Sequence, residues 1–184
     1  GVNRSQAVAG EKTSFYLQAK DSTGNNKVTN GDAQGDLQSP QEQFSVDIIG
    51  EHISLSGMVT YLDSGQYRVD YTIIKAGNYQ VHVKTGGTDI YCGLGEGNKC
   101  SPFALEVLPG ETLSSICEAE SSFDPVDNLV EARAGDVGKI YLQAKDAFGN
   151  NRRSGGDDVL VTFTSAVNPD VRYRGNVVDR DDGT

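Results

Sequence analysis

Apolar and polar residues alternate along several short stretches of this chain. Two examples are Phe44-Ser-Val46-Asp-Ile48 and Tyr79-Gln-Val81-His-Val83. The same alternation occurs in residues 15–19, 67–71, 103–107 and 140–144. A period of two places successive side chains on opposite faces of an extended chain, so each stretch predicts a strand with one buried face and one wet face. We find no window with a sustained helical period.

Turn residues separate these predicted strands. Asp63-Ser64-Gly65 and Lys75-Ala76-Gly77-Asn78 are typical of tight turns. Several short strands at a spacing of about 8–12 residues predict an all-β fold, an antiparallel β-sandwich. Tyr79 directly follows the second turn, where immunoglobulin-like folds often anchor a tyrosine hydroxyl to nearby backbone. An ordinary core tyrosine fits this position equally well.

The chain also nearly repeats itself. Residues 9–26 read AGEKTSFYLQAKDSTGNN and residues 134–151 read AGDVGKIYLQAKDAFGNN, a constant offset of 125 residues. A repeat unit of this length is a whole domain rather than a short solenoid unit. The chain is therefore expected to consist of similar modules, which favours structure, spacing or adhesion over chemistry.

The two copies differ in length. Gly57 corresponds to Gly175 at an offset of 118, so the first copy carries a net seven extra residues after Asp32, which we assign to the polar stretch 33–43. Residues 67–109 have no counterpart in the second copy. We expect a first repeat at residues 1–109, a linker at 110–122, and the N-terminal part of a second repeat at 123–184 that lacks the last three strands.

A partial sandwich exposes its apolar face and is not expected to fold alone. The missing strands would come either from a continuation of this chain or from another chain. We favour the continuation.

The ordered series of motifs resembles the filamin-type immunoglobulin-like repeat. The motifs run as follows: Ala9-Gly10, Asp21 to Asn25, Gly31-Asp32, Phe44-x-Val46-x-Ile48, Gly57-x-Val59, Asp63-x-Gly65-x-Tyr67-x-Val69-x-Tyr71, Ala76-Gly77-x-Tyr79-x-Val81-x-Val83 and Ser101-Pro102-Phe103-x-Leu105-x-Val107. The resemblance covers residues 7–109 and resumes from 134 to 184. It implies tandem filamin-type sandwiches, of which the second is incomplete.

Composition limits the classes of partner. The 184 residues carry a net charge of −10, which repels nucleic acid and anionic lipid because phosphate binding needs clustered Lys and Arg. The chain has no apolar stretch near the roughly 20 residues that span a bilayer. We expect protein partners, either neighbouring repeats or other chains of an assembly, with no nucleic acid and no membrane insertion within this chain.

Three cysteines bear on the cellular compartment. Cys92 and Cys100 bracket the segment CGLGEGNKC, whose three glycines let it bend enough for a disulfide. Two reduced thiols in a cytosolic loop are the alternative. Zinc is disfavoured because no companion pair of Cys or His is present. Cys117 lies in the predicted linker, and its pairing stays open, since it can bond a cysteine outside this chain or displace one of the other two.

A second sign of the compartment is Asn3-Arg4-Ser5, an acceptor pattern for N-glycosylation on Asn3. A disulfide implies an oxidising environment. Together these signs favour an extracellular or cell-surface protein, unlike the filamins that crosslink actin in the cytosol.

Residues with catalytic potential are scarce. His52 and His82 lack the neighbours of a nucleophilic site, and no glycine-rich phosphate loop precedes a helix. Acidic side chains at 157–158, 179 and 181–182 are calcium candidates, but the spacing of a twelve-residue calcium loop is absent. Asp21 and its counterpart Asp146 lie in turns where a carboxylate accepts backbone N–H groups. We predict no catalytic residue, cofactor or metal, and no enzyme activity.

These observations favour a non-catalytic structural or adhesive module of an extracellular multi-repeat protein, including a subunit of an extracellular filament or a ciliary appendage. The resemblance also implies an alternative, a cytosolic actin-crosslinking scaffold that binds peptides by strand addition. The binding edge would then be residues 44–49, with Ser45, Asp47 and Ile49 facing outward. A third alternative is an accessory module of a larger enzyme.

Overall fold

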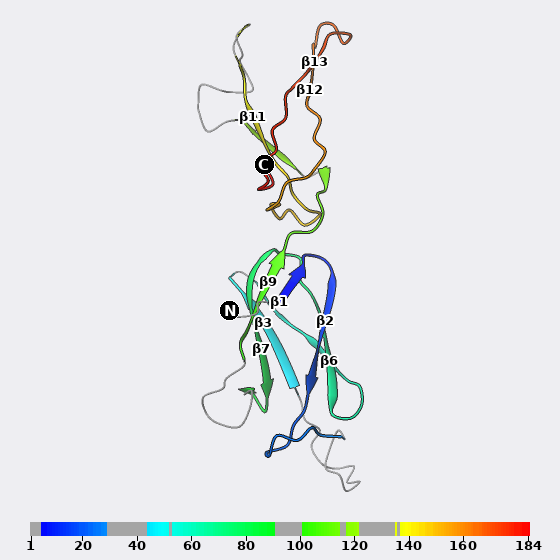
Figure 1. Ribbon diagram of the computed structural model, residues 1–184, viewed down its shortest axis with the longest axis vertical. Coiled ribbons are helices and arrows are strands. Elements are labelled where there is room, and N and C mark those ends of the chain that lie inside the picture. The colour runs from blue at the N-terminus through cyan, green and yellow to red at the C-terminus, as the bar shows by residue number, and fades with distance from the viewer. Residues whose placement is uncertain are drawn as a thin grey trace. The chain divides into compact units, whose positions relative to one another are not determined.

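The computed structural model describes residues 5–28, 44–51, 53–90, 101–114, 117–121, 135 and 137–184. The fold is all-β, as predicted, and the chain divides into two compact units, Gly1–Leu108 and Pro109–Thr184 (Figure 1). Because each unit has its own sheets, the two are described separately, as unit 1 and unit 2.

Unit 1 is a sandwich of two sheets. Its strands are β1 Ser5–Val8, β2 Lys12–Gln18, β3 Phe44–Gly50, β4 Ser54–Ser56, β5 Met58–Tyr61, β6 Gln66–Thr72, β7 Gly77–Thr85, β8 Thr88–Asp89 and β9 Phe103–Leu108. One sheet has the order β1-β9-β7-β3-β4, with β8 beside β7, and the other has the order β2-β6-β5. The described pairs of unit 1 are antiparallel except for β1 and β9, which are parallel. The predicted antiparallel sandwich therefore contains one parallel pair.

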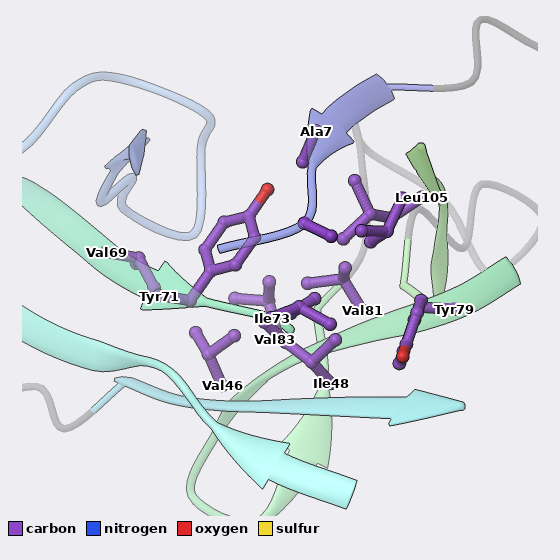
Figure 2. Packing of buried hydrophobic residues seen from close by; sticks show 12 residues of the cluster. Ala7, Val46, Ile48, Val69, Tyr71, Ile73, Tyr79, Val81, Val83 and Leu105 are labelled. Carbon is purple, nitrogen blue, oxygen red and sulfur yellow. The ribbon is translucent and has the colours of Figure 1, made fainter. Parts of the chain in front are cut away.

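The core of unit 1 lies between these two sheets. Val69 and Tyr71 of β6 face Val46 and Ile48 of β3, together with apolar residues of β7 and β9 (Figure 2). Ile48 is fully buried, with 0 % of its surface exposed. The predicted alternation therefore identifies the inward residues correctly, apart from Phe103 at the start of β9, which is 39 % exposed.

Tyr79 forms the corner that its position after a turn predicts. Its hydroxyl donates a hydrogen bond of 2.7 Å to the carbonyl oxygen of Lys75, and the side chain is 5 % exposed. This bond satisfies a polar group that the ring carries into an apolar environment, where an unpaired hydroxyl would be costly.

Unit 2 contains two strand pairs. β10 Glu118–Ser121 is antiparallel to β11 Ile140–Gln143, and β12 Thr162–Thr164 is antiparallel to β13 Arg172–Arg174. β10 lies inside the range 110–122 that we predicted as a linker. That prediction is wrong for this segment, because its backbone pairs with the sheet of unit 2 instead of running free.

The beginning of the predicted linker is also part of unit 2. The amide of Leu113 donates to the carbonyl of Lys145 at 2.8 Å, and the amide of Gly110 donates to the carboxylate of Asp146 at 2.8 Å. Sequence alternation does not reveal these contacts, because the donors lie in a polar stretch with no strand pattern.

A set of glutamine hydrogen bonds occurs in both units. In unit 1 the Gln18 side-chain amide donates to the carbonyl groups of Ala19, Lys27 and Gly65. In unit 2 the Gln143 amide donates to the carbonyl groups of Ala144, Arg152 and Gly183. The first two acceptors keep the offset of 125, whereas Gly65 and Gly183 differ by 118. Both offsets predicted from the sequence are therefore reproduced in three dimensions.

Backbone bonds also locate the length difference between the copies. The Gly57 amide donates to the Val46 carbonyl at 2.9 Å, and the Gly175 amide donates to the Val161 carbonyl at 3.0 Å. Val46 and Val161 differ by 115, whereas the earlier residues of the two copies differ by 125. The first copy therefore has ten more residues than the second between the shared turn and this valine. It has three fewer residues between this valine and the glycine at 57 or 175. The predicted net difference of seven thus combines a longer segment with a shorter hairpin. It also follows that β12 and β13 correspond to β3 and β4.

Candidate functional site

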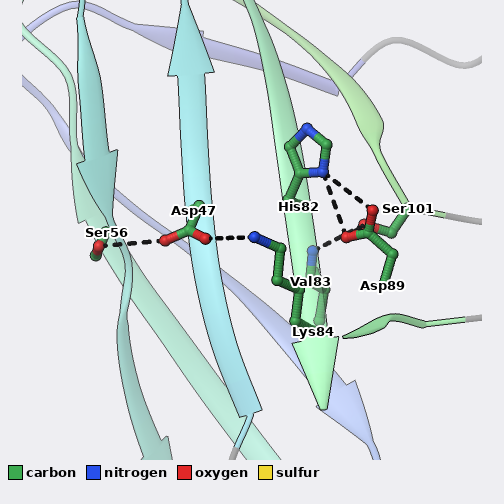
Figure 3. A network of polar contacts seen from close by, with 7 residues as sticks. All are labelled: Asp47, Ser56, His82, Val83, Lys84, Asp89 and Ser101. Carbon is green, nitrogen blue, oxygen red and sulfur yellow. Dashed lines mark hydrogen bonds and ion pairs between the residues drawn. The ribbon is translucent and has the colours of Figure 1, made fainter. Parts of the chain in front are cut away.

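The outer face of β3 and β7 carries the main polar network of unit 1 (Figure 3). Lys84 of β7 donates to the carboxylate of Asp47 on β3 at 2.9 Å, and the Ser56 hydroxyl donates to the same carboxylate at 3.4 Å. The hydrogen bond from Lys84 holds the pKa of Asp47 below its usual value, against the opposing effect of desolvation. Asp47 in turn raises the pKa of the Lys84 amine. Such a partly exposed ion pair contributes little to stability, because solvent screens it.

A second part of the network joins Asp89, Ser101 and His82. The Ser101 hydroxyl donates to Asp89 at 2.9 Å, and His82 Nδ1 lies 3.2 Å from the other carboxylate oxygen. Desolvation acts to raise the pKa of Asp89, but the contacts with Ser101 and His82 outweigh it, so the pKa is lowered overall.

These three residue types also occur in hydrolytic triads, but here their order is different. A serine nucleophile needs a histidine that accepts its proton, with the carboxylate behind the histidine. In this network the carboxylate lies between the other two, and the Ser101 hydroxyl donates directly to it. Ser101 is also only 2 % exposed. The arrangement therefore stabilises a connection between strands and lacks the geometry of a nucleophile.

This network joins the residues that flank the segment 91–100. The Ile90 amide donates to the Val83 carbonyl at 2.9 Å, and the Val83 amide donates to the Ser101 hydroxyl at 2.9 Å. The two residues that flank this segment thus meet at one residue of β7. We did not predict this clamp from the sequence. The available signal was a polar residue near each end of the inserted segment, Asp89 and Ser101.

The motif Gly31-Asp32, the predicted extra stretch 33–43 and four candidate residues lie outside the described residues. The four are Asn3, His52, Cys92 and Cys100. The predicted glycosylation and the predicted disulfide therefore stay predictions.

The proposed partner-binding strand is not an open edge over most of its length. β3 pairs with β7 along its whole length and with β4 at Asp47, Ile48 and Ile49. The prediction of an edge strand at Asp47 and Ile49 is wrong on this point, because β4 already occupies their backbone side. Ser45, Asp47 and Ile49 do face away from the core, as alternation predicts.

A hollow lies beside one of these outward residues. Its volume is about 420 Å³, and its lining includes Ile49, Gly50, Gln80 and Ala104. Ile49 is 43 % exposed. An interaction at this face would use side chains rather than backbone addition to β3.

The aspartate side chains in the two acidic turns accept hydrogen bonds from backbone amides of the same turns. Asp21 accepts hydrogen bonds from the amides of Thr23 and Asn25, and Asp146 accepts from those of Phe148 and Asn150. Side-chain hydrogen bonds from Asn25 and Thr23 lower the pKa of Asp21. For Asp146, desolvation acts upward, yet the hydrogen bonds prevail and its pKa is also lowered. Both carboxylates thus accept backbone N–H groups, as predicted.

The later acidic residues behave in the same way. Asp179 accepts hydrogen bonds from the amides of Gly156 and Asp181, and Asp182 accepts from Thr184. Over the described ranges, no group of three or more His, Cys, Asp or Glu side chains is arranged to hold a metal ion.

Cys117 is partly buried in unit 2 and is a free thiol within the described residues. Its sulfur accepts the Lys145 amide at 3.4 Å and lies 3.5 Å from the Leu113 carbonyl oxygen. The thiol thus joins the segment after Pro109 to the strand region that follows β11.

Comparison with protein families assigns the fold. The family model described as Filamin/ABP280 repeat matches residues 1–92, half of the chain. The chain belongs to the filamin repeat family. The matched region contains β1 to β8 of unit 1, whereas β9, which carries the last motif of the resemblance, lies beyond it.

Solved structures similar to this filamin repeat chain share little sequence with it. The Lin-41 filamin domain is 18 % identical, with 58 % of this chain and 86 % of that one covered and a TM-score of 0.42. InvD of Yersinia pseudotuberculosis is 14 % identical, covering 99 % and 51 %, with a TM-score of 0.47. Domains 5–6 of the S-layer protein SbsC are 16 % identical, covering 98 % and 80 %, with a TM-score of 0.37.

A search of curated proteins gave no match. In the parts of the chain that the structure describes, no helix is long and apolar enough to cross a membrane.

Proposed function

We propose that this filamin repeat chain is a non-catalytic structural or adhesive module of a multi-repeat protein at the cell surface or outside the cell. The observation that carries this proposal is the recurrence of one hydrogen-bonded framework in both units, centred on Gln18 in one and Gln143 in the other. A module that is duplicated together with its internal framework is suited to extending and spacing an assembly. Its partners would be neighbouring repeats or other chains.

The absence of a nucleophile geometry around Ser101 supports a non-catalytic role for unit 1. A filament subunit, a ciliary appendage and a cell adhesin are the finer forms of this proposal. An accessory module of a larger enzyme would have the same fold, with the catalytic groups in another domain.

The extracellular location rests on a disulfide between Cys92 and Cys100. Ile90 and Ser101 both hydrogen-bond to Val83, so the chain enters and leaves the segment at one place. Cys92 follows Ile90 by two residues and Cys100 directly precedes Ser101. Closely spaced ends favour the short Cβ separation that a disulfide needs. Glycosylation of Asn3 would agree with the same location.

The disulfide can be tested by equilibrating the protein in glutathione buffers set to cytosolic and to extracellular redox potentials. Oxidised glutathione takes the two electrons and two protons of the thiols, and the Cys92 and Cys100 sulfurs form the bond. Mass spectrometry after alkylation should show the two cysteines linked, with Cys117 alkylated. Both should become alkylated after reduction.

A Cys117→Ser variant is the matched control, and its linkage should be unchanged. If Cys92 and Cys100 stay alkylatable in the oxidising buffer, the extracellular proposal loses its chemical support. The cytosolic scaffold would then be favoured.

The cytosolic scaffold would bind peptides through the β3 region. In that case the outward side chains of Ser45, Asp47 and Ile49 would carry the interaction, because β4 pairs with the backbone at Asp47 and Ile49. Their role in partner binding stays a prediction. An Ile49→Ser variant that keeps its stability but loses a partner would support the scaffold.

A further inference from the structure

The chain passes from unit 1 to unit 2 through Pro109. On the unit 1 side, the Leu108 carbonyl accepts a hydrogen bond of 2.8 Å from the Ala9 amide. On the unit 2 side, the Gly110 amide donates to the Asp146 carboxylate at 2.8 Å. The peptide groups before and after this one proline are therefore each oriented by a bond to their own unit.

Few torsions separate these two peptide groups. A peptide group is planar, so it moves as one rigid plate. The Leu108 carbonyl belongs to the plate before Pro109, and the Gly110 amide belongs to the plate after it. Only φ and ψ of Pro109 lie between the plates, and the proline ring holds φ near about −65°. One soft torsion, ψ of Pro109, is left between the two hydrogen-bonded groups.

Arg152 adds to the bonds that hold Gly110 in unit 2. Its Nη1 donates to the Gly110 carbonyl oxygen at 2.6 Å, and its Nη2 donates to the Ser154 hydroxyl at 3.3 Å. Gly110 is buried, so both of its backbone polar groups are bonded away from bulk water. Hydrogen bonds from a charged donor are stronger than neutral ones. The Thr112 hydroxyl, two residues further on, donates to Asp157 at 2.8 Å.

The copy in unit 1 shows what is particular to this arrangement. Asp146 corresponds to Asp21 at the offset of 125, but Arg152 corresponds to Lys27. Asp146 is 1 % exposed, whereas Asp21 is exposed. A guanidinium presents several donors in a fixed plane, which a lysine amine does not. The arginine and the buried carboxylate thus serve the chain that enters unit 2, in addition to the turn that both copies share.

We propose that Arg152 and Asp146, here called the Gly110 anchor, confine the movable part of the connection between the units to the single residue Pro109. Without the anchor, the movable part would extend toward Leu113, whose amide donates to the Lys145 carbonyl at 2.8 Å. A connection with one soft torsion restricts how independently the two units reorient. This inference does not depend on the cellular location, because a short connection has the same consequence in any compartment.

The first test measures nitrogen-15 NMR relaxation of the 184-residue chain, which gives a rotational correlation time for each unit. The reference is a chain with Gly-Gly-Ser-Gly inserted between Leu108 and Pro109, which lengthens the connection and leaves the Gly110 anchor in place. We expect long and similar correlation times for both units of the unmodified chain, and shorter, unequal times after the insertion. Measurement at two protein concentrations separates this effect from self-association. If the unmodified chain behaves like the insertion chain, the proposal is wrong.

A substitution in the Gly110 anchor locates the restriction. Arg152→Ala should shorten both correlation times toward those of the insertion chain. It should also speed hydrogen exchange of the Gly110 amide by roughly tenfold or more, because the charged donor that helps to hold this residue is lost. Arg153→Ala, at the exposed neighbouring position, is the matched control and should change neither measurement. Equal effects of the two substitutions would reject a specific role for Arg152.

A second variant tests the torsion itself. Pro109→Gly frees φ but removes no hydrogen bond, because proline has no backbone N–H. We expect shorter correlation times for both units, while the Gly110 amide stays as protected as in the unmodified chain. This variant also decides the case in which Arg152→Ala fails to fold, which the loss of dispersed unit 2 resonances would reveal. Correlation times that stay unchanged in Pro109→Gly would overturn the proposal.

Discussion

Units 1 and 2 share a hydrogen-bonded framework but differ in how they bury apolar surface. Asp21 and Asp146 hold equivalent turns, and Gly65 and Gly183 accept equivalent bonds. Yet the buried apolar cluster belongs to unit 1, and the one buried apolar residue described in unit 2 is Ala144. The polar framework therefore forms in both units, whereas the buried cluster of unit 1 also uses β7 and β9.

The largest expected contrast comes from truncating equivalent core positions. Ile48→Ala should lower the free energy of unfolding by about 2–5 kcal/mol, because it opens a cavity in a closely packed core. Phe163→Ala in the 184-residue chain should cost clearly less than Ile48→Ala, since Phe163 is 47 % exposed. Guanidinium unfolding followed by far-ultraviolet circular dichroism measures both. Equal losses would show that the two faces are equally buried and would remove the contrast.

The next contrast concerns the shared turns. Asp146→Ala should cost about 1–3 kcal/mol, because it leaves the buried amides of Asn150 and Gly110 without an acceptor. Asp21→Ala is the matched control and should cost less, because its turn is exposed to water. Hydrogen exchange of residues 145–152 localises the loss. A larger loss at Asp21 would contradict this order.

The effect of Asp146 should also depend on pH. Its folded-state pKa is lowered, so its stabilising contribution is complete above its unfolded-state pKa of about 3.9 and is lost as the pH falls through the lower folded-state value. The difference in unfolding free energy between the unmodified protein and Asp146→Ala should therefore shrink as the pH falls below about 4. A difference that stays constant down to the acid transition would argue against a role for the ionised carboxylate.

The smallest expected effect is that of the tyrosine corner in unit 1. Tyr79→Phe keeps the buried ring but removes the hydrogen bond to Lys75, at a cost of about 0.5–1.5 kcal/mol. Tyr16→Phe is the control, because Tyr16 is 66 % exposed and should be neutral. Thermal unfolding of the two variants gives the comparison. A neutral Tyr79→Phe would mean that the corner contributes packing alone.

Several sequence predictions failed at places where contacts cross long distances along the chain. β10 was predicted as linker because its short sequence does not alternate, and only its pairing with β11 makes it a strand. The binding edge at residues 44–49 was taken from the resemblance, and the structure pairs β4, a three-residue strand, with Asp47 and Ile49. The clamp of Asp89 and Ser101 joins residues on either side of a ten-residue segment, and its one signal in the sequence is a polar residue near each end of that segment.

The sequence alone determined the faces of the strands, the duplication and the acidic turns. These features depend on neighbours in the chain, such as the alternation around Val46 and the contacts of Asp21 with Asn25, four residues away. The tertiary structure alone decided which strand covers which face, the parallel pairing of β1 with β9, and the exposure of Phe163 where Ile48 is buried. Burial depends on strands that are distant in sequence, so similar local patterns accompany a buried core in unit 1 and exposed apolar side chains in unit 2.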